Sequence, residues 1–311
     1  MSQPSLAQLR VSDPILTAVA RGYLSQKPAI ANALFPIVSV MSRAGRIMKF
    51  DADSFKLVGT ARAPGANTKR VQFGYGVDNF SLVDHRLEGT VPRELQQEAQ
   101  NGPGIDLAAN AVRRVQDMMA LEREKAAADL ARNPASYGAN NKVALSCSSQ
   151  WSNPASDPFA NIIGAKEVIR SQTGEEPNVL ALSPKALTAL RTNSKVLDRL
   201  STATDRVPAT MAQLAALFEV DAIVKGGALY NNAGTLADVW GTDAILAYTT
   251  PATMQEMGSP SYGYTYQLGD GVDVEPGYYD NNTATWNYPV SDAYQPVLAG
   301  PAAGYLFQNA A

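Results

Sequence analysis

The sequence predicts an α+β protein, and three features carry this prediction. Two strand-like segments, residues 45–51 and 70–91, flank a stretch rich in Gly and Pro, which is the pattern of a long β-hairpin. Residues 103–132 have the composition and spacing of one long helix. Residues 153–250 alternate helical and strand-like segments, as a compact α/β unit does. With 311 residues, of which 45% are hydrophobic, the chain can form about two domains with sizeable cores.

The predicted hairpin cannot be stable by itself. In its first arm Lys49 lies between two apolar residues, and Gly59, Pro64 and Gly65 mark the turn region. Two strands alone bury too little surface to be stable in water. The hairpin is therefore predicted to rest on another surface.

The residues before the hairpin are expected to form one short helix and one strand. Asp13 as N-cap and Pro14 at the first helical position begin a short amphipathic helix. Residues 25–33 are expected to be a linker. The strand-like residues 34–40 include Pro36, which favours a position at the edge of a sheet or an irregular entry into the strand.

The segment 103–132 is the strongest helix prediction in the chain. Ala108, Val112, Val115 and Met119 recur at helical spacing, and Ala, Glu, Lys and Arg give it high helix propensity. A helix of this length would be about 45 Å long. The Asn133-Pro134 pair is expected to end it.

Capping residues mark the helix starts of the α/β unit. Asp157 and Ser183, each followed by Pro, and Thr210 are predicted N-caps, and Gly174 is expected to close the first of these helices. Strands are expected at 178–183, at 221–226, within 238–250 and in the tail after residue 259.

Charge is distributed unevenly along the chain. The first 75 residues hold ten Lys or Arg and three Asp, whereas residues 226–311 hold eight acids and no Lys or Arg. Such asymmetry indicates that one end meets an acidic partner, either nucleic acid or the acidic end of a neighbouring copy. Chance clustering on solvated faces is the alternative. Charged residues make up only 18% of the chain, below the ordinary ~25%, which also favours a surface covered by partners.

The sequence contains no motif of an enzyme active site. P-loop, dinucleotide-binding, nucleophile-elbow and zinc-protease motifs are all missing. His85 and Cys147 are the only His and the only Cys, too few for a structural zinc site. His85 is expected to be a polar residue on an exposed strand. We therefore predict no enzymatic activity, no cofactor and no metal.

Two other segments allow a binding role. The acidic segment 269–277 could attract calcium, but its spacing does not match an EF-hand and an acidic turn is favoured. Tyr262, Tyr264 and Tyr266 share one face of a strand. Such a row can bind a sugar or a base, although a packed strand face is the commoner use.

The order of the segments resembles a known family over nearly the whole chain. The segments are DPILTAVARGYLSQKPAIANALFPIVSV, the hairpin tip GTARAPGA, the long helix, WSNPASDPFANIIGAKEVIRSQTGEEPNVLALS, DVWGTDAILAYTTP, PSYGYTYQL and GPAAGYLFQNA. In this order they resemble the major capsid proteins of tailed bacteriophages with the Hong Kong 97-type fold.

This resemblance implies a division of the chain into named parts. They are an N-terminal arm (1–32), an extended hairpin or E-loop (43–92), a peripheral domain (93–152 and 251–311) containing the spine helix (103–132), and an α/β axial domain (153–250).

The resemblance also implies function, partners and location. The chain is expected to self-assemble into pentamers and hexamers of an icosahedral shell around double-stranded DNA, with the hairpin lying across the adjacent subunit. Only about a dozen residues precede the first predicted helix, so a separate scaffolding protein is expected beside a portal. The protein is expected in the virion capsid after synthesis in the bacterial cytoplasm. The N-terminus lacks the apolar core of a signal peptide, and no apolar run is long enough to span a membrane.

Two sets of residues are candidates for contacts in such a shell. Contacts between subunits are expected from basic residues near the hairpin tip and from acids of the tail: Arg62, Lys69, Arg70, Asp270, Asp273 and Glu275. Non-specific contacts with packaged DNA are expected from residues of the arm: Arg10, Arg21 and Lys27.

Two alternatives remain open from the sequence. The first is an encapsulin-like compartment, which encloses a cargo protein in place of DNA. The second is a glycan-binding or polysaccharide-active tail-associated protein that uses the tyrosine strand.

Overall fold

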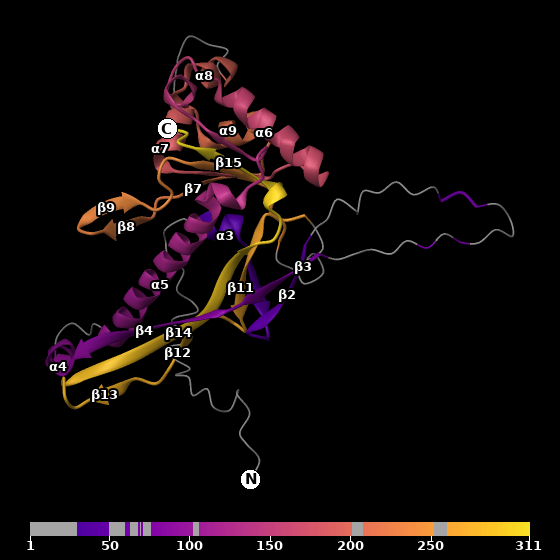
Figure 1. Ribbon diagram of the computed structural model, residues 1–311. Coiled ribbons are helices and arrows are strands. Elements are labelled where there is room, and N and C mark those ends of the chain that lie inside the picture. The colour runs from indigo at the N-terminus through magenta and orange to yellow at the C-terminus, as the bar shows by residue number, and fades with distance from the viewer. Residues whose placement is uncertain are drawn as a thin grey trace.

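The computed structural model describes residues 30–49, 60–62, 68, 70, 76–101, 106–200, 208–251 and 260–311 (Figure 1). Predictions for residues 1–29, including the Asp13 N-cap and the helix after it, lie outside this part of the chain. The described residues form two sheets, two separate two-stranded ribbons, and helices that cover the sheets. None of these helices is both long and apolar enough to cross a lipid bilayer.

The larger sheet has six strands built around one long strand. Its members are β1 (Ile37–Val40), β4 (Val83–Pro92), β11 (Gly263–Leu268), β12 (Asp273–Val274), β13 (Tyr278–Asp280) and β14 (Thr285–Leu298). Ten residues of β14 pair with β4 on one side, and β11, β12 and β13 pair with it on the other. β1 pairs only with β11 among the described strands, which confirms the edge position predicted from Pro36.

One face of this sheet is covered by the first half of α5 (Leu107–Arg132). The close approach is possible because Gly89 of β4 has no side chain: a Cβ there would lie 3.1 Å from the Cβ of Ala111. The chain reaches α5 from β4 through α4 (Arg93–Asn101). The core between helix and sheet consists of Val91, Val112, Val115, Met119, Val274, Tyr288 and Val290.

The long-helix prediction is confirmed except at its start. The carboxylate of Asp106 accepts a hydrogen bond from Ala109 N at 3.0 Å, and Asp106 has an extended backbone, so α5 begins at Leu107. Residues 103–105 of the predicted helix lie outside the described residues. An Asp at this position satisfies one of the free N–H groups of the first turn. The helix ends at Arg132, as Asn133-Pro134 predicts.

The smaller sheet has five strands, of which β6 (Val179–Leu182) and β10 (Ala244–Ala247) are buried on both faces. Its order is β5 (Lys142–Ala144), β15 (Gly304–Gln308), β10, β6 and β7 (Ala222–Lys225). In β6, Leu180 and Leu182 enter one core while Val179 and Ala181 enter another. A strand buried on both faces reads as a continuous apolar run, which is why this segment, VLAL, lacks polar alternation.

Helices cover the smaller sheet on both sides. On one side lie α6 (Pro158–Thr173), α7 (Pro184–Thr192), α8 (Ser194–Leu200) and α9 (Met211–Phe218). On the other lie α3 (Ile30–Leu34) and the second half of α5, whose Ala127, Ala128 and Ala131 allow close packing. The described residues also include three short 3-10 turns: η2 (Pro134–Ser136), η3 (Cys147–Ser149) and η5 (Pro301–Ala303).

The three predicted N-caps of this unit are confirmed. Side-chain oxygens of Asp157, Ser183 and Thr210 accept hydrogen bonds from the backbone N–H three residues ahead, at 3.2, 3.2 and 3.3 Å. Gly174 closes α6 in the left-handed conformation at φ 75°.

The two ribbons are not hydrogen-bonded to the strands of either sheet. In one, β2 (Ala44–Lys49) pairs antiparallel with β3 (Gly76–Ser81), as the hairpin prediction requires. Its base rests on the larger sheet, where the ring of Phe80 stacks on Tyr266 with centroids 4.3 Å apart. In the other ribbon, β8 (Leu229–Asn232) pairs with β9 (Thr235–Asp238).

Three local predictions are wrong. Residues 30–33 belong to α3 and not to a linker, because Ile30 and Leu34 are buried between α5 and the smaller sheet. The strand-like segment 70–91 is interrupted at Leu82, after which β4 leaves the hairpin and pairs with β14. In 238–250 only Ala244–Ala247 extends β-structure beyond β9, since Gly241 at φ 54° turns the chain.

Sheet pairing also crosses the expected division into domains. Residues 93–152 and 251–311 were assigned to a peripheral domain, yet β5 and β15 come from these segments and pair within the five-stranded sheet of the α/β unit. Likewise, β4 lies within the expected hairpin segment 43–92 but is a strand of the larger sheet.

A buried carboxylate ties these parts together. Glu124 of α5 is 3% exposed and accepts hydrogen bonds from Ile30 N (2.9 Å), Ala31 N (3.1 Å) and Trp240 Nε1 (2.6 Å). Burial raises the pKa of Glu124, although these three hydrogen bonds oppose the rise. One side chain thus fastens α3 and the turn before β10 to the middle of the long helix.

Arg132, the last residue of α5, also binds the turn before β10. Arg132 Nε contacts Asp243 Oδ2 at 2.6 Å, and its Nη1 donates to Val239 O at 3.0 Å. The remaining oxygen of Asp243, Oδ1, accepts from Asn309 N at 2.9 Å. The guanidinium lies so close to Gly241 that a Cβ there would be 2.4 Å from Nη2.

We expect Glu124→Gln to lower the free energy of unfolding by about 2 kcal/mol, because an amide NH₂ would face buried N–H donors. Urea unfolding followed by circular dichroism measures this loss. The matched control is Glu122→Gln on the same helix, whose exposed carboxylate lies 3.5 Å from His85 Nδ1. An exposed contact of this kind contributes little, so this variant should change the value by less than about 0.5 kcal/mol. Equal effects of both variants would contradict the role assigned to Glu124.

Candidate assembly surfaces

The basic residues expected near the hairpin tip are only partly within the described chain. Arg62 and Arg70 are exposed, and Arg62 Nη1 lies 3.4 Å from Thr68 Oγ1. Lys69 lies outside the described residues, as do Arg10, Arg21 and Lys27 of the arm.

The structure does not bring the three expected acids together as one open patch. Asp270 is exposed in the turn after β11. Asp273 is 8% exposed and lies opposite Ser291 where β12 pairs with β14. Glu275 Oε2 is half-buried and paired with Arg86 Nη2 at 2.8 Å. Asp270 and Glu275 therefore remain as accessible acids.

The tyrosine row is packed inside the protein. Tyr262 bonds through its hydroxyl to that of Tyr137, Tyr264 Oη lies 2.9 Å from Thr250 Oγ1, and Tyr266 stacks on Phe80. Burial raises the pKa of Tyr266 to about 12. The packed-face interpretation is confirmed, and the row offers no surface to a sugar.

His85 lies on β4, a strand most of whose residues are exposed, as expected, but its own side chain is partly buried. It lies on the face of β4 that α5 covers, and its ring stacks on Tyr294 at 4.1 Å. Nδ1 of His85 is 3.5 Å from Glu122 Oε1. Its cross-strand neighbour Asp292 accepts a hydrogen bond from Gln267 Nε2 at 2.7 Å, and burial raises the pKa of the Asp292 carboxyl.

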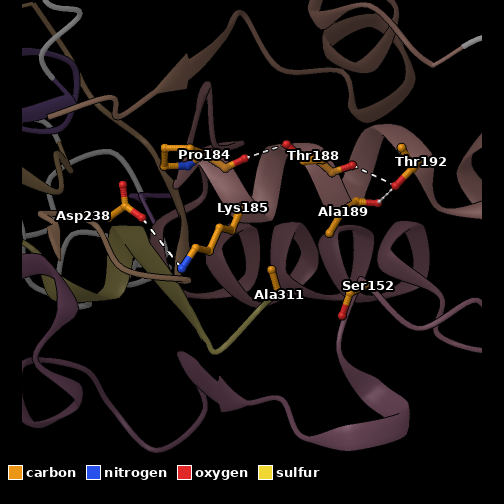
Figure 2. A pocket seen from close by; sticks show the side chains of 8 residues that line it. All are labelled: Ser152, Pro184, Lys185, Thr188, Ala189, Thr192, Asp238 and Ala311. Atoms are coloured by element: carbon orange, nitrogen blue, oxygen red, sulfur yellow. Dashed lines mark hydrogen bonds and ion pairs between the residues drawn. The ribbon is translucent and has the colours of Figure 1, made fainter. Parts of the chain in front are cut away.

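A shallow hollow of about 520 Å³ lies beside α7 (Figure 2). Its lining includes Lys185 and Asp238, whose charged atoms are 3.9 Å apart. The hydroxyls of Thr188 and Thr192 donate to carbonyls one turn earlier in the helix, at Pro184 and Thr188. These four side chains are thus occupied with neighbours of their own chain. In the described part of the chain, no group of three His, Cys, Asp or Glu side chains could hold a metal ion.

The outer face of β4 carries a polar network that fixes how the hairpin leaves the body. Arg43, just before β2, pairs with Asp84 at the start of β4. Further along, Tyr278 Oη donates to Glu88 Oε2 at 2.8 Å, next to the Arg86–Glu275 pair. Exposed pairs of this kind contribute little stability, but they hold strand and loop in one register.

The sequence reasoning missed several large apolar side chains that the structure exposes. They are Met41, Leu95, Met118, Leu229 and Leu236. For the last two a signal existed: Ala233-Gly234 between two short strand-like runs indicates a tight hairpin turn. These surfaces, with the polar face of β4, suit association with other chains better than chemistry on a small molecule.

Relatives in sequence match this chain from end to end. It is 32% identical over 312 residues to the major capsid protein of Burkholderia phage BcepMu, covering 98% of each chain. It is 29% identical over 309 residues to the major capsid protein of Pseudomonas phage JBD67, covering 96% of each. No family model matches the sequence.

Solved structures share the fold. A phage-related protein from Bordetella bronchiseptica RB50 is 43% identical, with a TM-score of 0.79 over 97% of this chain and 98% of that one. The capsid of cyanophage P-SCSP1u gives 0.57 at 12% identity, over 92% and 89%. The SrpI encapsulin of Synechococcus elongatus PCC 7942 gives 0.53 at 12% identity, over 99% and 96%. The last two show likeness of fold alone.

The full-length match at more than 30% identity shows the family, and the fold agrees with it. The protein is a capsid shell protein that belongs to the major capsid proteins of tailed bacteriophages, with the Hong Kong 97-type fold.

Proposed function

We propose that this chain assembles into the pentamers and hexamers of an icosahedral phage head that encloses double-stranded DNA. The observation that carries this proposal is the end-to-end match with the major capsid protein of Burkholderia phage BcepMu. The work of the subunit is association and not catalysis. Many modest contacts, repeated by symmetry, close the container.

The geometry of the β2–β3 ribbon supports association through the hairpin. In the described part of the ribbon, Ile47 and Phe80 are buried against the larger sheet. A two-stranded ribbon is not stable without further support. In the proposed shell, the adjacent subunit gives that support, at ~25 cal/mol per Å² of apolar surface before ordering costs.

We assign the domain names by sheet. The five-stranded sheet with α6 to α9 is the proposed axial domain, and it includes β5 and β15. The six-stranded sheet with the first half of α5 is the proposed peripheral domain. The proposed partners are further copies of this chain, a separate scaffolding protein, a portal and packaged DNA. The proposed place of synthesis is the host bacterial cytoplasm.

The two alternatives have less support. The encapsulin-like compartment rests on likeness of fold at 12% identity. The glycan-binding protein was motivated by the tyrosine row, which is buried.

Negative-stain electron microscopy of the purified protein tests the proposal. We expect closed shells, rings or tubes, because the apolar surfaces on the ribbons and helices need neighbours. Small uniform particles at every protein concentration would contradict it. Mass spectrometry of particles from infected cells then separates a DNA-filled head from a compartment that holds a cargo protein.

Charge pairing between hairpin and tail is expected to set register and assembly rate more than strength. We expect Arg62→Glu with Arg70→Glu to slow shell formation in light scattering, because these side chains would repel Asp270 and Glu275 of the next subunit. The charge-matched control is Arg114→Glu with Lys225→Glu, two exposed residues outside the hairpin. Unchanged assembly of the hairpin variant rules out this pairing.

The arm residues Arg10, Arg21 and Lys27 are proposed to touch DNA without sequence preference. Binding of such a kind weakens with salt as counterions are released, with a logarithmic slope of about −0.9 per phosphate contacted. Replacing all three residues by Gln should reduce the slope by about 2.7 units in DNA-binding titrations of assembled shells. An unchanged slope would show that the arm residues do not contact DNA.

A further inference from the structure

The β8–β9 ribbon is a short, rigid projection from the body (Figure 1). Its turn uses Ala233 at φ 50° and Gly234 at φ 93°, and two successive positive φ values match the twist of a tight hairpin. Asn231 Oδ1 accepts a hydrogen bond from Gly234 N at 2.8 Å, which fixes the turn.

The root of the ribbon is clamped to the rest of the molecule. Val239 N donates to Ala228 O at 3.0 Å, while Val239 O accepts from Arg132 of α5. Gly226 lies so close to Trp240 that a Cβ there would be 2.4 Å from the indole Cδ1. The ribbon is therefore held at a set angle by the same turn that Glu124 fastens.

The two faces of the ribbon differ in chemistry. Tyr230 and its cross-strand partner Ala237 share one face, and Tyr230 packs on the core with Lys125 Nζ 5.4 Å from its ring centroid. Side chains alternate along a strand, so Leu229 and Leu236 share the other face. They are 45% and 70% exposed, and they belong to none of the apolar clusters formed by the described residues.

We propose that the face carrying Leu229 and Leu236 packs against a second copy of this chain in the assembled shell. It would form a contact between subunits separate from the β2–β3 hairpin. This inference rests on the proposed shell function.

The size of the ribbon argues for a second copy over a free partner. A stable complex between independent proteins needs about 800 Å² from each side, which eight paired residues with two leucines cannot supply. A small apolar contact is useful only where other contacts already hold the partner in place, because the effective concentration is then high. In a shell, other copies of this chain are held in that way.

The first experiment measures the critical concentration for shell assembly. Leu229→Thr with Leu236→Thr keeps strand propensity and should raise this concentration about tenfold or more, since two buried leucines are replaced by polar residues. The control, Asn232→Thr with Thr235→Ser on the opposite face of the same ribbon, should assemble like the wild type. Circular dichroism and urea unfolding of the unassembled subunits should be alike for all three. Assembly of the leucine variant at the wild-type concentration would overturn the proposal.

The second experiment needs no destabilising change. The photoreactive residue p-benzoylphenylalanine is placed at position 236 and, as a control, at position 235, and shells are irradiated. We expect covalent dimers of this chain from position 236, fewer from 235, and none from unassembled subunits. Cross-links from position 236 only within one chain, or only to a different protein, overturn the proposal even if the leucine variant does not fold.

The outcomes distinguish a failure of the proposed shell function from a failure of the proposed ribbon contact. If the wild-type protein forms no shells, the proposed function fails and this contact fails with it. If wild-type shells form, but the leucine variant assembles equally well or position 236 yields no intermolecular cross-link, only the ribbon contact is lost.

Discussion

The architecture depends on one helix that serves two cores. The first half of α5 covers the six-stranded sheet, and its second half covers the five-stranded sheet. At about 1.5 Å per residue its 26 residues reach about 39 Å, more than one small core requires. Glu124 lies in its second half, where the carboxylate holds α3 and the turn at Trp240. Tyr262, directly before β11, adds a second link between the sheets, because its ring packs against Gly304 of β15 and its backbone N–H donates to Tyr248 O.

A buried carboxylate at such a junction has a high desolvation cost. Its desolvation disfavours the charged form, as the raised pKa of Glu124 records, and three N–H donors offset the cost only while all are in place. An apolar junction would tolerate sliding between the parts. The carboxylate accepts only one arrangement, which suits a subunit whose two sheets must keep a constant relation to their neighbours.

The helix caps could be predicted from the sequence, whereas contacts between residues far apart in the chain could not. The caps at Asp157, Ser183 and Thr210 depend on groups three residues away, so type and spacing were sufficient to predict them. The partners of Glu124 lie 94 and 116 residues away, and no local pattern marks them. The burial of Asp273 follows from the pairing of β12 with β14, and β4 alternates in the same way whether it belongs to a hairpin or a sheet. The interpretation of the whole chain therefore came from the order of its segments.

The order of strands in the smaller sheet constrains when the subunit is complete. β15 lies between β5 and β10, although it is the last of these strands to be synthesised. Until the ribosome has passed Gln308, β5 has no strand beside it and one edge of β10 stays open. A nascent chain thus cannot present the finished surface of this sheet. The strand order therefore disfavours assembly of subunits that are still being synthesised.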